Sequence, residues 1–244
     1  GVASGLAAAA FVAALEALTE LLGPENWSDT GTLVVLGAAG AGIALITLLL
    51  GNPGDVELLV DNIHVSGGRS DIRDLRSLLP VALLGIAAGS AIGPEAPLVQ
   101  TTGSIGSWVG LRLRLSEEEM RLLTISCMAA GFTVLLGVPL GSAVFALEIL
   151  HRRGLEYYEA LLPALVGALS GYAVYVAITG LGLEPALDLP TPAALEVGHL
   201  PMAAGLGVLG ALLAAVFTYG TSILRSMWRR VPVAVRPIVG GLAL

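Results

Sequence analysis

The sequence predicts an all-α, polytopic membrane protein, and three observations lead to that fold class. Hydrophobic residues make up 55% of the 244 residues and charged residues only 13%, whereas a soluble domain carries about a quarter charged residues. The mean hydropathy of +0.86 leaves too little polar surface to cover an apolar core in water. The apolar stretches are rich in Ala, Leu and Gly and lack the alternation of barrel strands, which indicates spanning helices.

Uncharged apolar runs give the clearest spans. A helix needs about 20 residues to cross about 30 Å of hydrocarbon, because each residue rises by about 1.5 Å. Three such runs are Leu33–Leu50, Leu161–Leu183 and Ala203–Leu224. Other classes of protein are disfavoured: no basic face with interleaved aromatic residues indicates nucleic-acid binding, and the single cysteine, Cys127, excludes an internal disulfide.

The basic residues predict the orientation. All twelve are arginines, and they fall in the segments 69–76, 112–121, 152–153 and 225–236. Arginine collects in cytoplasmic loops because basic residues near the ends of a span resist translocation. We therefore expect these segments on the inside, and the acidic loops 23–30 and 180–199 on the outside.

This alternation predicts a path for every helix. The expected elements are 2–22 outward, 31–50 inward, a short inner helix at about 54–63, 73–90 outward, 95–111 inward, 117–135 outward, 139–150 inward, 155–179 outward, 199–229 inward, and a last helix from about Val233. The stretch 139–150 is too short to span, at about 18 Å of helix. Short or interrupted helices occur at membrane depth only where they are buried in protein or line a wet cavity.

One carboxylate lies inside an apolar stretch. In "AIGPEAPLV" (91–99), Glu95 follows a Gly-Pro break and begins the expected helix 95–111. Its carboxylate has two interpretations. It caps the helix by accepting free backbone N–H bonds, aided by the helix dipole. Alternatively, it is a tethered anion that competes with an inorganic anion for the same N–H groups, since helix N-termini bind anions and intramembrane acids are often functional.

Two blocks of sequence resemble one known family. "GSAIGPEAPLVQTTGSIGSWVG" (89–110) resembles the G-[RK]-E-G-P signature of the CLC family of chloride channels and proton-coupled anion exchangers, with the small-residue helix that follows it. "AAGFTVLLGVPLGSAVFALEIL" (129–150) resembles a second family block. The positions that match are Val99, Gln100, Gly103, Ile105, Gly106, Ala129, Ala130, Gly131, Pro139, Leu140, Phe145 and Glu148.

The resemblance implies a fold of two inverted halves with short and re-entrant helices. Residues 1–180 correspond to the first repeat, and residues 181–244 to an external loop and the start of the second repeat. We expect the remainder of that repeat in a longer protein. The family also implies a homodimer with one anion path in each subunit, and a location in the lipid bilayer, which we expect to be a bacterial inner membrane.

The resemblance also implies a site. Glu95 is expected to be the gate, and the anion is expected to bind at Gly93, Pro94, Glu95 and Ala96, where helix N-termini meet. The transported ion is expected to be chloride or another small anion, with protons as a second substrate in the exchangers. We expect no enzymatic activity, no catalytic residue, no metal and no cofactor.

The signature departs from the family pattern. Pro94 stands in place of a basic residue, which lowers the positive potential near the site, and Ala96 stands in place of glycine. The family serine that helps hold the anion has its best counterpart at Asn52 in "GNPGD" (51–55), where an amide N–H₂ is a possible donor. An ordinary turn is an equally good interpretation of this stretch. Fluoride or nitrate selectivity is therefore an alternative to chloride.

The proton path departs as well. Proton-coupled members carry an acid at the position of Ile149, and Glu148 lies one residue earlier, about 100° around the helix. Glu148 is either part of a proton route or a structural residue that pairs with Arg152 at i,i+4. The loss of the usual acid favours a channel or a weakly coupled exchanger.

Two other classes of function remain as alternatives. An intramembrane serine protease would use Ser170 in "GALSGY" (167–172) with His199, but the G-x-S-G spacing is absent. A structural half-protein without transport is the other alternative.

Overall fold

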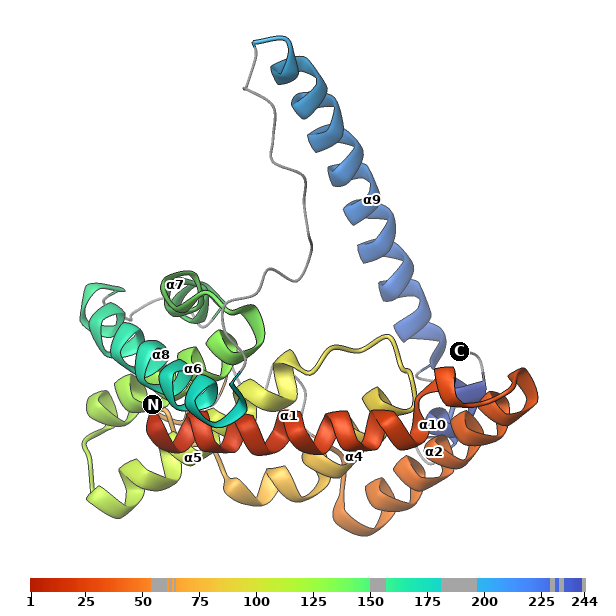
Figure 1. The fold of residues 1–244 in the computed structure, drawn as a ribbon, viewed down its shortest axis with the longest axis horizontal. Coiled ribbons are helices and arrows are strands. Elements are labelled where there is room, and N and C mark those ends of the chain that lie inside the picture. Colours follow the sequence, from red (N-terminus) through yellow and green to blue (C-terminus); the bar gives the residue numbers. More distant parts are fainter. Residues whose placement is uncertain are drawn as a thin grey trace. The chain divides into compact units, whose positions relative to one another are not determined.

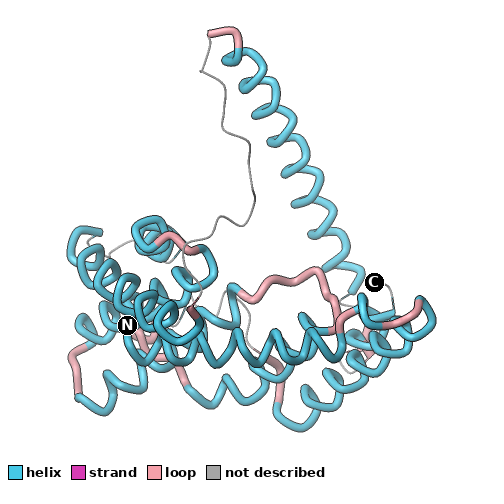
Figure 2. Tube along the Cα trace, viewed as in Figure 1, coloured by secondary structure: helices cyan, strands magenta, loops and turns pink. Residues whose placement is uncertain are grey.

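The computed structural model describes residues 1–53, 61, 63, 65–149, 157–180, 197–228, 231–232 and 235–242. These residues form helices joined by loops and contain no strand (Figures 1 and 2). The all-α prediction is thereby confirmed for the described part of the chain. The short inner helix expected at about 54–63 falls almost wholly outside it.

The helix boundaries lie close to those expected from the sequence. The elements are α1 (Val2–Leu22), η1 (Pro24–Asn26), α2 (Asp29–Leu50), η2 (Ile72–Asp74), α4 (Leu75–Ala87), α5 (Glu95–Leu113), α6 (Glu117–Leu136), α7 (Pro139–Ile149), α8 (Tyr157–Thr179), α9 (His199–Trp228) and α10 (Arg236–Leu242). Among the described residues, five helical segments are long and apolar enough to cross a membrane. These are Val2–Asn26, Asp29–Leu50, Glu117–Leu136, Glu159–Thr179 and His199–Trp228.

Local sequence sets where several helices begin and end. Ser28 caps α2 by accepting the Gly31 N–H at 3.3 Å. Ser116 and Glu119 form a capping box at the start of α6, in which each side chain satisfies a backbone N–H of the other residue. Gly137 ends α6 in the left-handed region, where glycine has no Cβ to clash.

The chain forms two compact units. Gly1–Glu184 and Pro237–Leu244 make up the first, and Pro185–Arg236 makes up the second. In the second unit, α9 is a single helix of 30 residues with no buried residue. The repeat boundary expected near residue 180 stays a prediction.

Small residues hold the helices of the first unit close together. Along α5, Gly103, Gly106 and Gly110 face α6, where a Cβ built on Gly103 would lie 2.5 Å from Met128 Cε and one on Gly110 would lie 2.5 Å from Met120 Sδ. A Cβ on Gly106 would lie 2.9 Å from Cys127 Sγ. Glycine lets the two helices approach this closely without moving these side chains, as expected for membrane helix pairs, whose interfaces are rich in small residues.

The contact of α8 with α6 follows the same rule. A Cβ on Gly167 would overlap the backbone carbonyl and the hydroxyl of Ser126, and that hydroxyl donates to the Pro163 carbonyl at 2.6 Å. The apolar core on either side includes Val99, Ile125, Met128, Phe132 and Ala164. A second cluster joins α1 to α5 and α8 through Ala8, Phe11, Leu98, Val134 and Tyr175.

Buried hydroxyl groups fasten the loop 65–71 to α5 and α6. Ser70 donates its N–H to Ser107 Oγ at 2.9 Å, and its hydroxyl lies 2.8 Å from Ser104 Oγ. Thr124 Oγ1 donates to the Gly68 carbonyl at 2.9 Å. Gly68 has φ +80°, and a Cβ there would lie 2.7 Å from Arg121 Cα, so both its conformation and its space require glycine. We call the three hydrogen bonds among these residues the hydroxyl clamp.

Candidate functional site

The candidate site lies at the N-terminus of α5. The preceding helix α4 ends at Ala87, and Gly89 with φ +99° turns the chain away from it. Pro94 is the N-cap of α5, with φ −76° and ψ −1°, and Glu95 is the first helical residue. The Gly-Pro break therefore starts the helix at the position expected from the sequence.

Two prolines define which backbone donors this helix end offers. Proline has no N–H, so Pro94 and Pro97 contribute none. The Leu98 N–H is already bonded to the Pro94 carbonyl at 3.0 Å. The N–H groups of Glu95 and Ala96 therefore remain as the free donors at the positive end of the helix dipole.

The Glu95 side chain is exposed and turns back along the chain. Its carboxylate lies against Gly93, so closely that a Cβ built on Gly93 would overlap both carboxylate oxygens. No hydrogen bond to this carboxylate occurs from any residue that the structure describes. The capping interpretation, which requires such bonds from the helix N–H groups, is therefore not realised in this conformation.

The other expected site residues lie apart from Glu95 in the sequence, and within the described part of the chain no hydrogen bond joins them to it. Asn52 follows Gly51, the C-cap of α2 with φ +93°, and is exposed. Glu148 is exposed in the last turn of α7. Arg152, with which Glu148 was expected to pair, falls outside the described residues. Of the anion-binding set, the structure brings together Gly93, Pro94, Glu95 and Ala96.

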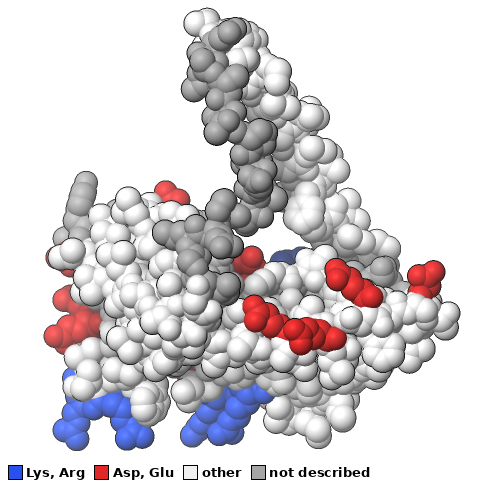
Figure 3. Space-filling view, in the orientation of Figure 1, with Lys and Arg blue, Asp and Glu red and all other residues white. Residues whose placement is uncertain are grey.

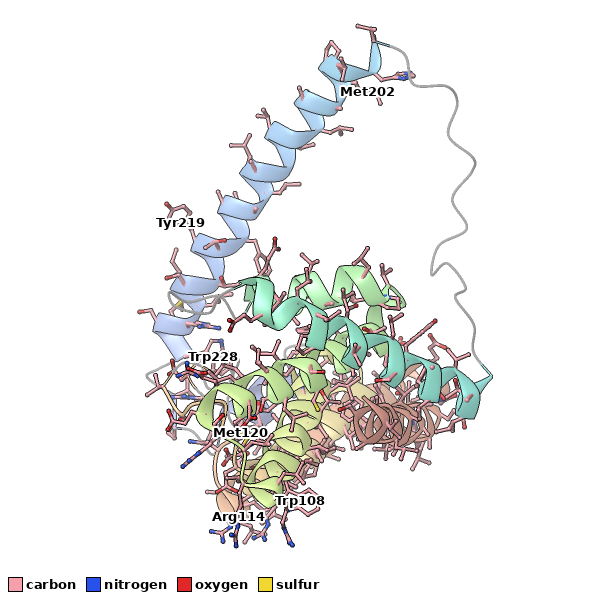
Figure 4. All side chains as sticks on the ribbon, turned by 90° about the vertical axis from the view of Figure 1, so that its left-hand side faces the viewer. Trp108, Arg114, Met120, Met202, Tyr219 and Trp228 are labelled. Carbon is pink, nitrogen blue, oxygen red and sulfur yellow. The ribbon has the colours of Figure 1, made fainter. Side chains whose placement is uncertain are left out.

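Charges are distributed unevenly over the first unit. The basic side chains gather along its lower edge in Figure 3. Among the residues of this unit that the structure describes, the exposed arginines are Arg69, Arg73, Arg76, Arg112 and Arg114. The Arg112 guanidinium carbon lies 5.2 Å from the centroid of the Trp108 ring, and Figure 4 shows Trp108 and Arg114 at the same end. Arginine with tryptophan is typical of a membrane interface.

Sequence reasoning missed several buried polar groups. Gln100 is 3% exposed and Ser142 is fully buried, yet neither Gln100 Nε2 nor Ser142 Oγ has a hydrogen-bond partner among the described residues. The hydroxyls of Ser104 and Ser107 in α5 lie three residues apart, which places them on one face of the helix. Gln100 lies four residues before Ser104, so the three side chains follow one face of α5. This spacing in the sequence predicts a polar stripe, which was not among the expectations above.

The serine proposed for a protease has other contacts. Ser170 Oγ donates to the Val166 carbonyl at 2.6 Å and lies 3.2 Å from the Gly167 carbonyl, both within α8. Such back-bonding is common for serine in membrane helices. These contacts do not favour a nucleophilic role for Ser170.

Comparison with known proteins gives consistent similarities. A sequence profile of the voltage-gated chloride channel family matches residues 55–244. A "Chloride/fluoride channel protein" of Pseudomonas syringae pv. tomato is 29% identical over 251 residues, which cover 99% of this chain and 53% of that protein. A "Putative chloride channel protein ClcB-like" of Ralstonia nicotianae is 32% identical over 167 residues, covering 66% of this chain and 38% of that protein.

A solved structure has the same fold. It is described as the X-ray crystal structure of a slow cyanobacterial Cl⁻/H⁺ antiporter, and it matches with a TM-score of 0.79 at 22% identity. The match covers 99% of this chain and 59% of that chain. The chain thus spans about half the length of the relatives it matches.

Proposed function

The chain belongs to the voltage-gated chloride channel family, and from that premise we propose that the full-length protein carries small inorganic anions across a membrane. The family consists of channels and transporters, and the five apolar helical segments make the chain part of an integral membrane protein. We place this protein in a bacterial inner membrane, as a homodimer whose subunits each contain an anion path. Residues 1–180 and 181–244 belong to its first and second inverted repeats.

The observation that carries the proposal is the N-terminus of α5. It presents two free N–H groups, from Glu95 and Ala96, at the positive end of a helix of 19 residues. Such helix ends bind anions because the N–H groups point at the ligand and the dipole favours negative charge. In transporters, half-helices present these ends to anionic substrates at membrane depth. Gly93 and Pro94 directly precede this helix end in the chain.

Glu95 is the gate in this proposal. The helix end binds the permeant anion, and the Glu95 carboxylate is a tethered anion at that same end. No described residue donates a hydrogen bond that holds the carboxylate in place. Protonation removes its charge, so the carboxyl group no longer competes for the anion position and the path opens. Acidic pH therefore raises the anion flux.

Chloride is the proposed ion, with fluoride as the first alternative. The similar protein of Pseudomonas syringae is named a chloride/fluoride channel, and this chain lacks the basic residue at position 94 and the serine near position 52. Asn52 is exposed and has space to donate from its amide. Weak chloride occupancy of the central site follows from these replacements.

The second part of the proposal concerns whether anion transport is coupled to proton transport. The similar solved structure is named an antiporter, whereas Ile149 stands where coupled members carry an acid. Glu148, exposed beside that position, is the residue proposed for a proton route. A channel or a weakly coupled exchanger is the form of transport that these residues favour.

The test uses the purified full-length protein in liposomes. Chloride efflux is recorded with and without a pH gradient, and external proton uptake is recorded at the same time. The proposal predicts flux above that of protein-free liposomes, and Glu148→Gln reduces any proton uptake without stopping chloride efflux. No flux of chloride, fluoride or nitrate above the protein-free control would contradict the proposed function.

A further inference from the structure

We infer that Gly93 is the seat of the gate: because it has no side chain, it leaves the space in which the Glu95 carboxylate rests. This inference deepens the proposed function and rests on Glu95 being the gate. It assigns to Gly93 a positioning role beside the anion-binding role expected from the sequence.

The direction of side chains in a helix places the carboxylate there. Every Cα–Cβ bond in an α-helix tilts towards the N-terminus, so the side chain of the first residue extends over the segment that precedes the helix. Glu95 is the first residue of α5, and Gly93 lies two residues before it. The carboxylate accordingly lies against the Cα of Gly93.

Space, rather than a special backbone conformation, is what glycine provides at this position. Gly93 is not among the glycines with positive φ, so alanine could adopt its backbone conformation. A Cβ at position 93 would nevertheless overlap Oε1, Oε2 and Cδ of Glu95. Any larger residue at position 93 therefore displaces the carboxylate.

The seat also lies where an anion would approach. The free N–H groups of Glu95 and Ala96 point out of the helix at its N-terminal end, and Gly93 lies before that end. A carboxylate resting on Gly93 keeps its negative charge on the segment that leads into these donors. No described residue donates a hydrogen bond to it, and the space that Gly93 leaves is what this resting position requires.

A single methyl group tests the inference. Gly93→Ala retains the backbone N–H, so it leaves any anion contact through that group intact, and it fills the space of the carboxylate. Chloride efflux from liposomes that contain the full-length protein should rise about twofold or more at pH 7.5, which corresponds to the lower end of the coupling energies between residues in contact. The increase of flux on acidification should become smaller.

Two matched variants separate this effect from general disturbance. Gly85→Ala in α4 adds the same methyl group where the nearest atoms are 3.5 Å and 3.6 Å away, and it should leave the flux unchanged. In the Glu95→Gln background, Gly93→Ala should add no further flux, because the blocking charge is already gone. An equal increase in both backgrounds would overturn the inference, as would a folded Gly93→Ala protein with wild-type flux and pH dependence.

A second variant decides the matter if Gly93→Ala does not fold. Glu95→Asp keeps the charge but is one methylene shorter, so its carboxylate does not reach the seat, and the flux at pH 7.5 should rise. Wild-type flux from Glu95→Asp would overturn the inference. If Glu95→Gln raises the flux but neither Gly93→Ala nor Glu95→Asp does, only the inference about Gly93 is overturned. If Glu95→Gln leaves the flux unchanged, the proposed gating role of Glu95 is overturned as well.

Discussion

The hydroxyl clamp predicts a local loss of stability when one methyl group replaces one hydroxyl group. Thr124→Val removes the donor that bonds the Gly68 carbonyl at 2.9 Å and preserves the volume of the side chain. Thr124 is fully buried and Gly68 is buried as well, so water does not readily replace the lost bond. No other described residue donates to this carbonyl.

The expected magnitude follows from the unsatisfied acceptor. Leaving a buried polar group without its partner costs about 1–3 kcal/mol. The free energy needed to open the loop 65–71 should fall by the same amount. This corresponds to amide hydrogen exchange that is about fivefold to about a hundredfold faster. Hydrogen exchange followed by mass spectrometry in detergent measures this on the Ser70 amide, whose N–H is bonded to Ser107 Oγ.

Thr133→Val is the matched control. Thr133 lies on the same helix and is equally buried, but its hydroxyl donates to the Ala129 carbonyl within α6. That carbonyl keeps its helical N–H bond after the substitution, so no acceptor is left without a partner. Equal exchange of the loop 65–71 in Thr124→Val and Thr133→Val would refute the reasoning.

Three further outcomes are expected. Gly167→Ala should lower the thermal midpoint in detergent by overpacking α8 on α6, at a cost of about 1–3 kcal/mol, whereas Gly85→Ala should not, since the atoms nearest to a Cβ there are 3.5 Å and 3.6 Å away; equal midpoints would contradict this. Ser116→Ala should cost about 1 kcal/mol by removing the cap of α6, and a midpoint unchanged from wild type would show that Glu119 alone supports that helix end. Asn52→Ala should weaken chloride binding in calorimetry, and an unchanged affinity would remove Asn52 from the anion site.

Much of the fold could be predicted from the sequence because membrane helices have clear boundaries. The expected helix 95–111 is observed as Glu95–Leu113, and the expected 117–135 as Glu117–Leu136. The Gly-Pro break and the Ser116 cap fix these starting points locally, without reference to the rest of the chain. The family resemblance, carried by two short blocks, is confirmed by a profile that matches residues 55–244.

The site could be predicted only in part. That Glu95 begins a helix follows from local sequence, but where its side chain rests depends on the empty space at Gly93. The contact of Ser70 with Ser104 joins residues 34 positions apart, and no local pattern specifies such a pairing.

The central claim is that the charge of Glu95 closes the anion path, and one measurement tests it most directly. Chloride efflux from liposomes is recorded between pH 4.5 and pH 7.5 for the full-length wild-type protein and for Glu95→Gln, which resembles the protonated state at nearly the same volume. The wild-type flux should rise as the pH falls, and the Glu95→Gln flux should be higher at pH 7.5 and almost independent of pH. A Glu95→Gln protein that retains the wild-type pH dependence would contradict the claim and leave Glu95 as a surface carboxylate at the start of a helix.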